Sequence, residues 1–248
     1  ELASCLVGSE MCIRDRSYLL KLKEAGLNSL PGTAAEILDD NVREIICPDK
    51  INTNEWLNVI KAAHSIGLPT TSTMMFGHVE NYYDIAQHMH ELKSLQLQSN
   101  EITEFVPLPY VASEAPMYLR GLSRSGPSFR ESVLVHSISR IYFNESIKNI
   151  QGSWVKMGYA GLSYLLDSGI NDVGGILMNE TITRSAGATH GQELDLIYIK
   201  NIVESKNMKL IERNTKYDLL KEPTKADFDK LKLKLKDVNH FDQERSFT

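Results

Sequence analysis

Short extended runs and helical segments alternate along the chain from residue 17, and this alternation limits the possible folds more than any other feature. Runs of β-branched and apolar residues predict strands at residues 27–30, 70–76, 102–106, 150–155 and 170–173. Apolar residues at helical spacing predict helices after nearly all of these strands. Because repeated βα units build parallel sheets, we expect an α/β fold. No GxGxxG opens a helix, so a partial (β/α)8 barrel, with roughly the last five of its βα units, fits better than a doubly wound sheet.

The composition is that of a globular protein and narrows the class of function. Of the 248 residues, 42% are hydrophobic and 24% are charged, so the chain can form a sizeable core. The net charge of −5 disfavours general nucleic-acid binding, which requires a positive surface. No apolar run approaches the roughly 18 residues of a membrane span, so we expect no membrane association. The three cysteines cannot form a paired framework, and we expect a cytoplasmic protein.

The first 16 residues differ in character from the rest of the chain. The run from Cys5 to Arg16 resembles translated sequencing-adapter sequence and lacks the pattern of a signal peptide. We therefore predict that residues 1–16 are not native, that residues 17–192 form the domain, and that residues 193–248 form a C-terminal extension. The lysines near the C-terminus have no interleaved aromatic residues, which favours a solvated helix face over a nucleic-acid patch.

Polar residues follow the first two predicted strands. Glu36 comes after the first strand, and His78 and Glu80 come after the second. In parallel βα folds the ligand-binding groups gather at the carboxyl ends of the strands, so these side chains are candidates for a site. As alternatives, Glu36 lies in the first turn of a helix, where the helix dipole favours it, and His78 is a surface residue.

Further candidates follow the last predicted strand. Asn171 and Asp172 lie at its end, and residues 178–192 are rich in glycine and small polar residues with no helical pattern. A loop of this length in a compact domain is usually functional or disordered, and its interspersed apolar residues argue against disorder. Its Asn179 and Glu180 would suit a polar heterocycle or an amino acid.

Other polar features have structural explanations. The pair Asp39–Asp40 precedes a short helix predicted at residues 42–46 and is expected to cap it. Asn52 and Glu55 form a capping-box pattern. Cys47 is expected to be a small buried residue, since no base is placed beside it by the sequence.

Five segments, in this order, resemble one group of enzymes. They are residues 26–38 (GLNSLPGTAAEIL), 73–80 (TMMFGHVE), 103–110 with 114–121, 149–155 (NIQGSWV) and 178–192. The first, second and fourth resemble radical S-adenosylmethionine (SAM) enzymes of the FO synthase and menaquinone (futalosine-pathway) group. The other two resemble the transferase subunit of FO synthase. The resemblance covers about residues 18–192.

The resemblance implies a (β/α) barrel that binds S-adenosyl-L-methionine and a [4Fe-4S] cluster, with the cluster held by a CxxxCxxC loop. It implies radical transfer of the 4-hydroxybenzyl group of L-tyrosine to 5-amino-6-(D-ribitylamino)uracil. A ring-closing partner subunit or fused domain then yields 7,8-didemethyl-8-hydroxy-5-deazariboflavin, the deazaflavin coenzyme precursor. This chain contains no CxxxCxxC, so the cluster ligands are absent from it and we expect the chain alone to be inactive.

The resemblance also implies site residues, which are assigned by position. The expected cofactor-binding residues are Glu36, Thr73, Met75, Gly77, His78 and Glu80, with Thr73 standing where the family pattern has glycine. The expected substrate contacts are Arg120, Asn171, Asp172, Asn179, Glu180 and His190. No catalytic residue and no metal ligand is assigned. Two alternatives stay open: a menaquinone-pathway enzyme acting on a futalosine-type nucleoside, and a non-catalytic binding or structural partner.

Overall fold

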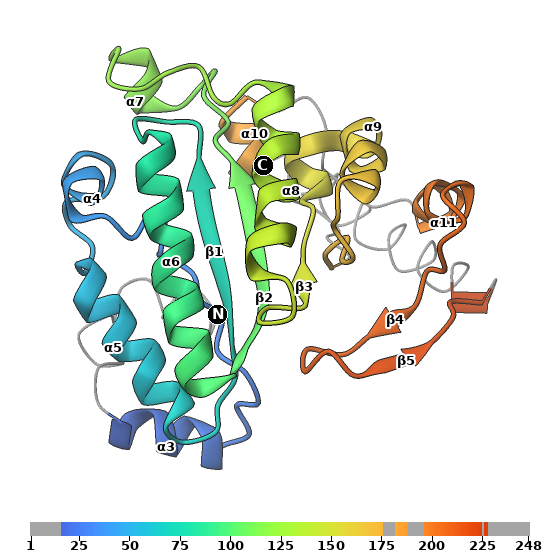
Figure 1. Ribbon diagram of the computed structural model, residues 1–248, viewed down its shortest axis with the longest axis horizontal. Helices are drawn as coiled ribbons and strands as arrows, with labels where there is room; N and C mark the ends of the chain where they lie inside the picture. The colour runs from blue at the N-terminus through green and yellow to red at the C-terminus, as the bar shows by residue number, and fades with distance from the viewer. Residues whose placement is uncertain (1–15, 176–181, 188–195, 225, 228–248) are drawn as a thin grey trace, which may run out of the picture.

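The computed structural model describes residues 16–175, 182–187, 196–224 and 226–227 (Figure 1). Its helices are α3 (Arg16–Glu24), α4 (Asp40–Ile46), α5 (Thr53–His64), α6 (Tyr82–Ser99), α7 (Pro116–Leu119), α8 (Phe129–Phe143), α9 (Trp154–Asp167), α10 (Ile182–Ser185) and α11 (Leu196–Ser205). Its strands are β1 (Thr70–Phe76), β2 (Ile102–Pro109), β3 (Asn149–Ile150), β4 (Glu212–Arg213) and β5 (Leu219–Lys221). No described helix is long and apolar enough to span a bilayer.

A parallel sheet in the order β1-β2-β3 lies at the centre of the molecule. Single parallel bridges, one between Leu30 and Thr70 and one between Gln151 and Asp172, extend it at both edges. Leu30 and Asp172 lie in the first and last strands predicted from the sequence, at residues 27–30 and 170–173, so each of these predicted strands is reduced to a single bridge. The predicted α/β class and the parallel pairing are therefore confirmed, while closure into a barrel is not seen among the described residues.

The side chains of β1 alternate between the two faces of the sheet. Thr70, Ser72, Met74 and Phe76 are buried, and the residues between them are partly exposed. Helices α6 and α8 lie over one face in Figure 1, and apolar side chains from α5, α6, α8 and α9 join those of the strands in one core. The other face of β1 is only partly covered by the described residues.

Helix caps place the loops at the strand ends. Asp39 caps α4 with its side chain, and Asn52 and Glu55 form a capping box on α5, as the sequence predicts. Asn81 begins a second capping box, on α6. Because α6 starts at once after the loop at residues 77–80, its cap fixes that loop against the end of β1.

The predicted strand at residues 150–155 is wrong in its extent. β3 ends at Ile150, and α9 begins at Trp154 with Ser153 as its N-cap residue. Trp154 and Val155 are buried on the first turn of this helix. A short apolar run does not distinguish a strand from a buried helix, and here the run continues across the turn between the two.

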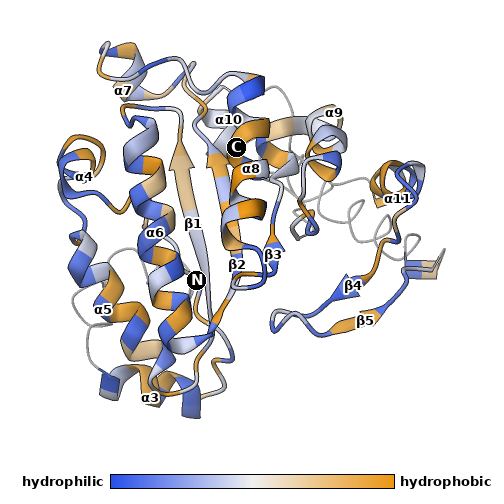
Figure 2. Cartoon of the chain, in the orientation of Figure 1, coloured by the Kyte–Doolittle hydropathy of each residue, from blue (hydrophilic) through white to orange (hydrophobic). Residues whose placement is uncertain are grey.

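Helix α8 lies where the sequence predicts it, but the apolar spacing that indicated it is on the exposed side. Leu134, Ile138 and Ile141 are exposed, and the ribbon of α8 carries hydrophobic colour over much of its length in Figure 2. The buried side carries Val135 and Phe143 together with small polar residues and a histidine. The helix is apolar on two sides, so spacing alone did not reveal which side meets the core.

The C-terminal part adds one helix and one hairpin. Ile199 and Val203 of α11 are buried in the core. After α11 the chain pairs through β4 and β5 in an antiparallel hairpin. The lysine-rich helix predicted from residue 228 onward lies outside the described residues.

Candidate functional site

One buried carboxylate ties together the loop after β1. Glu80 Oε1 accepts a hydrogen bond from the Gly77 N–H at 2.6 Å, and Oε2 accepts one from the His78 N–H at 2.8 Å. The Arg124 guanidinium lies 2.8 Å from Glu80 Oε1 and also pairs with Glu131 at 2.6 Å. The side chains of Glu80 and His78 are fully buried. Glu80 therefore fixes the loop, and both of its oxygens are engaged within the protein.

Two backbone contacts hold the imidazole of His78 in one orientation. Its Nδ1 accepts from the Val79 N–H at 2.8 Å, and its Nε2 donates to the Met75 carbonyl at 3.0 Å. Burial lowers the pKa of His78, although the Glu80 carboxylate opposes this shift. His78 Nδ1 also lies 3.0 Å from Glu80 Oε2. His78 is a buried loop residue and not a surface one.

The segment before α4 packs against the same end of β1. The Met75 N–H donates to the Glu36 carbonyl at 2.9 Å, and Thr73 Oγ1 donates to the Gly32 carbonyl at 3.1 Å. Glu36 lies in this loop with a φ of 45° and not in a helix, and its carboxylate pairs with Lys50 at 2.8 Å. The six predicted cofactor residues thus gather at one strand end, and their contact with a cofactor stays a prediction.

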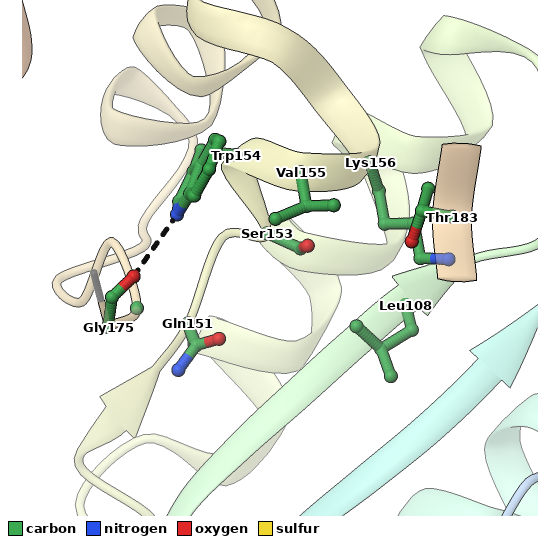
Figure 3. A pocket seen from close by; sticks show the side chains of 9 residues that line it. Leu108, Gln151, Ser153, Trp154, Val155, Lys156, Gly175 and Thr183 are labelled. Atoms are coloured by element: carbon green, nitrogen blue, oxygen red, sulfur yellow. Dashed lines mark hydrogen bonds between the residues drawn. The ribbon is translucent and has the colours of Figure 1, made fainter. Parts of the chain in front are cut away.

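A cavity of about 320 Å³ lies beside the turn that follows β3 (Figure 3). Leu108 of β2, Gln151, the first turn of α9, Thr183 and the Gly174–Gly175 pair line it. Trp154 Nε1 donates to the Gly175 carbonyl at 3.3 Å and so closes one side. The volume is at the lower end of the range for small-molecule sites, so the cavity can hold a ring-sized ligand group.

A charged cluster lies on the other side of Gln151. The two oxygens of Glu104 each lie 3.1 Å from Gln151 Nε2. Arg213, on the β4–β5 hairpin, lies 3.5 Å from Glu104, pairs with Asp172 and stacks over the Tyr217 ring at 3.9 Å. Burial raises the pKa of Glu104 to about 7, and the Asp172 carboxylate adds to the rise. This carboxyl group therefore titrates near neutral pH.

The predicted substrate residues do not form one group. Asp172 belongs to the charged cluster. Asn171 Oδ1 accepts from the Ile150 N–H at 2.9 Å and from Arg140 at 2.7 Å, so this amide stabilises the edge of the sheet. Arg120 is exposed at the end of α7, beyond the upper ends of β1 and α6 in Figure 1. Asn179, Glu180 and His190 lie outside the described residues.

The described residues do not fit an iron–sulfur cluster. They include one cysteine, Cys47, which is half-buried at the C-cap of α4 rather than buried as predicted. They contain no group of three or more histidine, cysteine, aspartate or glutamate side chains that could hold a metal ion. Thiolates are the ligands of such clusters. The described side chains therefore do not supply a cluster site.

Parallel βα units with polar groups at the strand ends define an α/β protein of the kind that binds ligands at the strand ends. The family model of the radical SAM superfamily matches residues 9–92. Membership of that superfamily implies SAM and a [4Fe-4S] cluster. The model of the CofH/MqnC C-terminal region matches residues 99–226, and the chain belongs to this family.

Curated relatives are 42–47% identical to this chain over the aligned residues. The 5-amino-6-(D-ribitylamino)uracil–L-tyrosine 4-hydroxyphenyl transferase of Methanococcus aeolicus is 47% identical over 83% of the chain and 57% of its own length. The enzyme of that name from Methanocaldococcus jannaschii is 46% identical over 86% of the chain and 60% of its own length. The FO synthase of Mycobacterium tuberculosis is 42% identical over 89% of the chain and 26% of its own length. The chain therefore spans little more than half the length of the transferases it matches.

A solved structure shows the same fold at low sequence identity. The crystal structure of methylornithine synthase (PylB) superposes with a TM-score of 0.62 and 18% identity. The match covers 87% of this chain and 58% of that one. This likeness confirms the fold and carries no information on the ligand.

Sequence patterns missed several residues of the site. Gln151 stood inside a predicted strand, and Arg124 stood in a segment with no predicted role. Glu104 gave a signal that could have been used, since a charged residue inside an otherwise buried strand needs a partner. Its partner Arg213 is 109 positions away along the chain, which no local pattern can indicate.

Proposed function

We propose that this chain forms part of a radical SAM transferase that joins the 4-hydroxybenzyl group of L-tyrosine to 5-amino-6-(D-ribitylamino)uracil. The observation that carries the proposal is identity of 47% and 46% to two transferases of that name, over more than four-fifths of the chain. The cavity beside β3 supports it, because ligands in parallel βα folds bind at the carboxyl ends of strands.

The described sheet belongs, in this proposal, to the last five βα units of a (β/α)8 barrel. Five parallel strand positions support this, three from named strands and two from bridges. The end of β1, with Glu36, Thr73, Met75 and Gly77, faces SAM. His78 and Glu80 hold that loop in shape, since their polar atoms are engaged within the protein.

A ring-closing activity acts after the transfer, as a partner subunit or as a fused domain. The support comes from the FO synthase relative, in which the matched region is 26% of a much longer chain. The remaining length of such relatives leaves room for a second activity.

The proposal is tested with full-length protein, reconstituted anaerobically and supplied with SAM, L-tyrosine and a reductant. With 5-amino-6-(D-ribitylamino)uracil we expect the coupled product, detected by mass spectrometry. Turnover of dehypoxanthine futalosine in its place would replace the proposal with a menaquinone-pathway activity. Absence of turnover with either substrate, in protein that holds its cluster, would favour the non-catalytic partner.

A further inference from the structure

We propose that Gln151 presents its side-chain carbonyl to an N–H donor of the pyrimidine ring of the substrate, and that Glu104 positions this carbonyl. The inference rests on the proposed function, because it takes the ribitylamino-uracil as the ligand of the cavity beside β3. It assigns a binding residue and a positioning residue that the sequence patterns did not indicate.

The amide of Gln151 has one favourable orientation next to an ionised Glu104. Its nitrogen lies 3.1 Å from both carboxylate oxygens. Above its pKa of about 7 the Glu104 carboxylate accepts hydrogen bonds and donates none, so the NH2 group faces Glu104 and Oε1 faces away. Figure 3 shows this oxygen directed into the cavity, toward the space between Ser153 and Leu108. No hydrogen bond between described residues uses it, which leaves the oxygen available to a ligand.

Gly174 keeps this oxygen uncovered. At Gly174 a Cβ atom would lie 3.1 Å from Gln151 Oε1, and the backbone there has a φ of +78°. At Gly152 a Cβ atom would lie 2.5 Å from Ile170 Cδ1. The turn after β3 therefore packs closely at its base, and a side chain at residue 174 would crowd the oxygen in the cavity.

The C-terminal hairpin holds Glu104 in place. The side chain of Glu104 is only 4% exposed, and Arg213 reaches both this carboxylate and that of Asp172. Arg213 is itself stacked on Tyr217. Glu104 touches Gln151 and not the cavity, so it acts through the amide. The hairpin thus takes part in orienting a group on the sheet, although it is distant in sequence.

The chemistry of the cavity favours the pyrimidine over tyrosine. A neutral amide oxygen suits the imide N–H of a uracil ring, and the neighbouring Ser153 hydroxyl suits a ring carbonyl. Leu108 and Trp154 supply apolar walls for a flat ring. The ammonium group of tyrosine would favour a carboxylate, but the nearby Glu104 and Asp172 are engaged by Arg213.

The test is equilibrium binding of 5-amino-6-(D-ribitylamino)uracil to the full-length protein by calorimetry, without reductant, so that no turnover is needed. Gln151→Leu keeps the bulk and removes the acceptor, and we expect about tenfold weaker binding. The matched control is Gln87→Leu, since Gln87 is also half-buried and donates to a carboxylate, Glu91, but lies on α6. This variant is expected to bind as the wild type does.

An analogue methylated at the imide nitrogen identifies the donor. Methylation should weaken binding to the wild type about tenfold and leave binding to Gln151→Leu nearly unchanged, because the two changes remove the same hydrogen bond. Glu104→Gln loses the fixed orientation and should weaken binding by a smaller factor. The double variant Gln151→Leu with Glu104→Gln should bind no more weakly than Gln151→Leu alone. If Glu104 has only a structural role, the double variant should bind more weakly than Gln151→Leu.

The outcomes separate this inference from the proposed function. Wild-type protein that binds the uracil, with Gln151→Leu equal to it, overturns the inference and leaves the proposed function intact. Equal loss on methylation in both proteins also overturns it, as does weakened binding of tyrosine with unchanged binding of the uracil. Wild-type protein that binds only a futalosine-type nucleoside overturns the proposed function first.

Discussion

The ends of β1 and β3 both carry a polar network, but the two networks leave different atoms available. At β1, both oxygens of Glu80 are engaged by backbone N–H groups and by Arg124. At β3, the side chain of Gln151 uses only its nitrogen in hydrogen bonds between described residues and directs its oxygen into a cavity. A buried charge at a strand end is therefore not in itself a sign of ligand binding. The polar atoms that the protein leaves without a partner are the better guide.

The largest effect should come from breaking the β1 network. Glu80→Ala leaves two buried N–H groups without an acceptor and removes one partner of Arg124, so we expect a loss of about 3–5 kcal/mol in the free energy of unfolding. Urea unfolding of the full-length protein measures it. Glu91→Ala on α6 is the control, and a loss below about 1 kcal/mol for Glu80→Ala would show that the loop does not depend on this carboxylate.

A second prediction concerns pH and the cluster next to β3. Burial raises the pKa of Glu104 from 4.5 to about 7, so the folded protein binds this proton more tightly than the unfolded chain does. The contribution of Glu104 to stability is therefore fully present below about pH 4.5 and is lost as the pH rises to about 7. Glu104→Gln has no carboxyl group to titrate, so its stability does not fall in this way. The difference in free energy of unfolding between the variant and the wild type should therefore shift by about 3 kcal/mol in favour of the variant from pH 4.5 to pH 7.

Urea unfolding at several pH values measures this difference, and Glu91→Gln, on a partly exposed carboxylate of α6, serves as the control. A constant difference between Glu104→Gln and the wild type from pH 4.5 to pH 7.5 would contradict the raised pKa.

A third prediction separates the hairpin from the sheet. Arg213→Ala removes the cation between Glu104 and Asp172, so two carboxylates face each other without compensation. Because the Arg213 side chain is about a quarter exposed, solvent screens these charges, and we expect a loss of about 1–2 kcal/mol in the free energy of unfolding. Without this cation the pKa of Glu104 should rise further. Unfolding measured at pH 6 and pH 8 tests this, because the loss should be larger at pH 8, where Glu104 is mostly ionised in the wild type and Arg213 stabilises that charge.

The β1 region could be predicted from the sequence, whereas the β3 region could not. The strand at residues 70–76 has a clear β-branched pattern with a glycine stop, so Thr73, Met75, Gly77 and His78 were placed together correctly. The short strand β3 runs into a buried helix through a turn, so its pattern is not periodic, and the predicted strand extends wrongly into α9 at Trp154 and Val155. Contacts such as Glu104 with Arg213 depend on the packing of segments 109 positions apart.

The smallest change in stability should come from Gln151→Leu, and this variant sharpens the comparison most. Gln151 contributes one amide contact to Glu104 and a side chain beside an open cavity, so we expect a loss below about 1 kcal/mol without ligand. A ligand at about 100 times its Kd stabilises the wild type by roughly 2.7 kcal/mol, and a tenfold weaker Kd reduces this to roughly 1.4 kcal/mol. Melting of the two proteins with and without 5-amino-6-(D-ribitylamino)uracil measures both quantities. If ligand stabilises Gln151→Leu as much as it stabilises the wild type, then the oxygen in the cavity is not a binding group, and the distinction between the two strand ends does not hold.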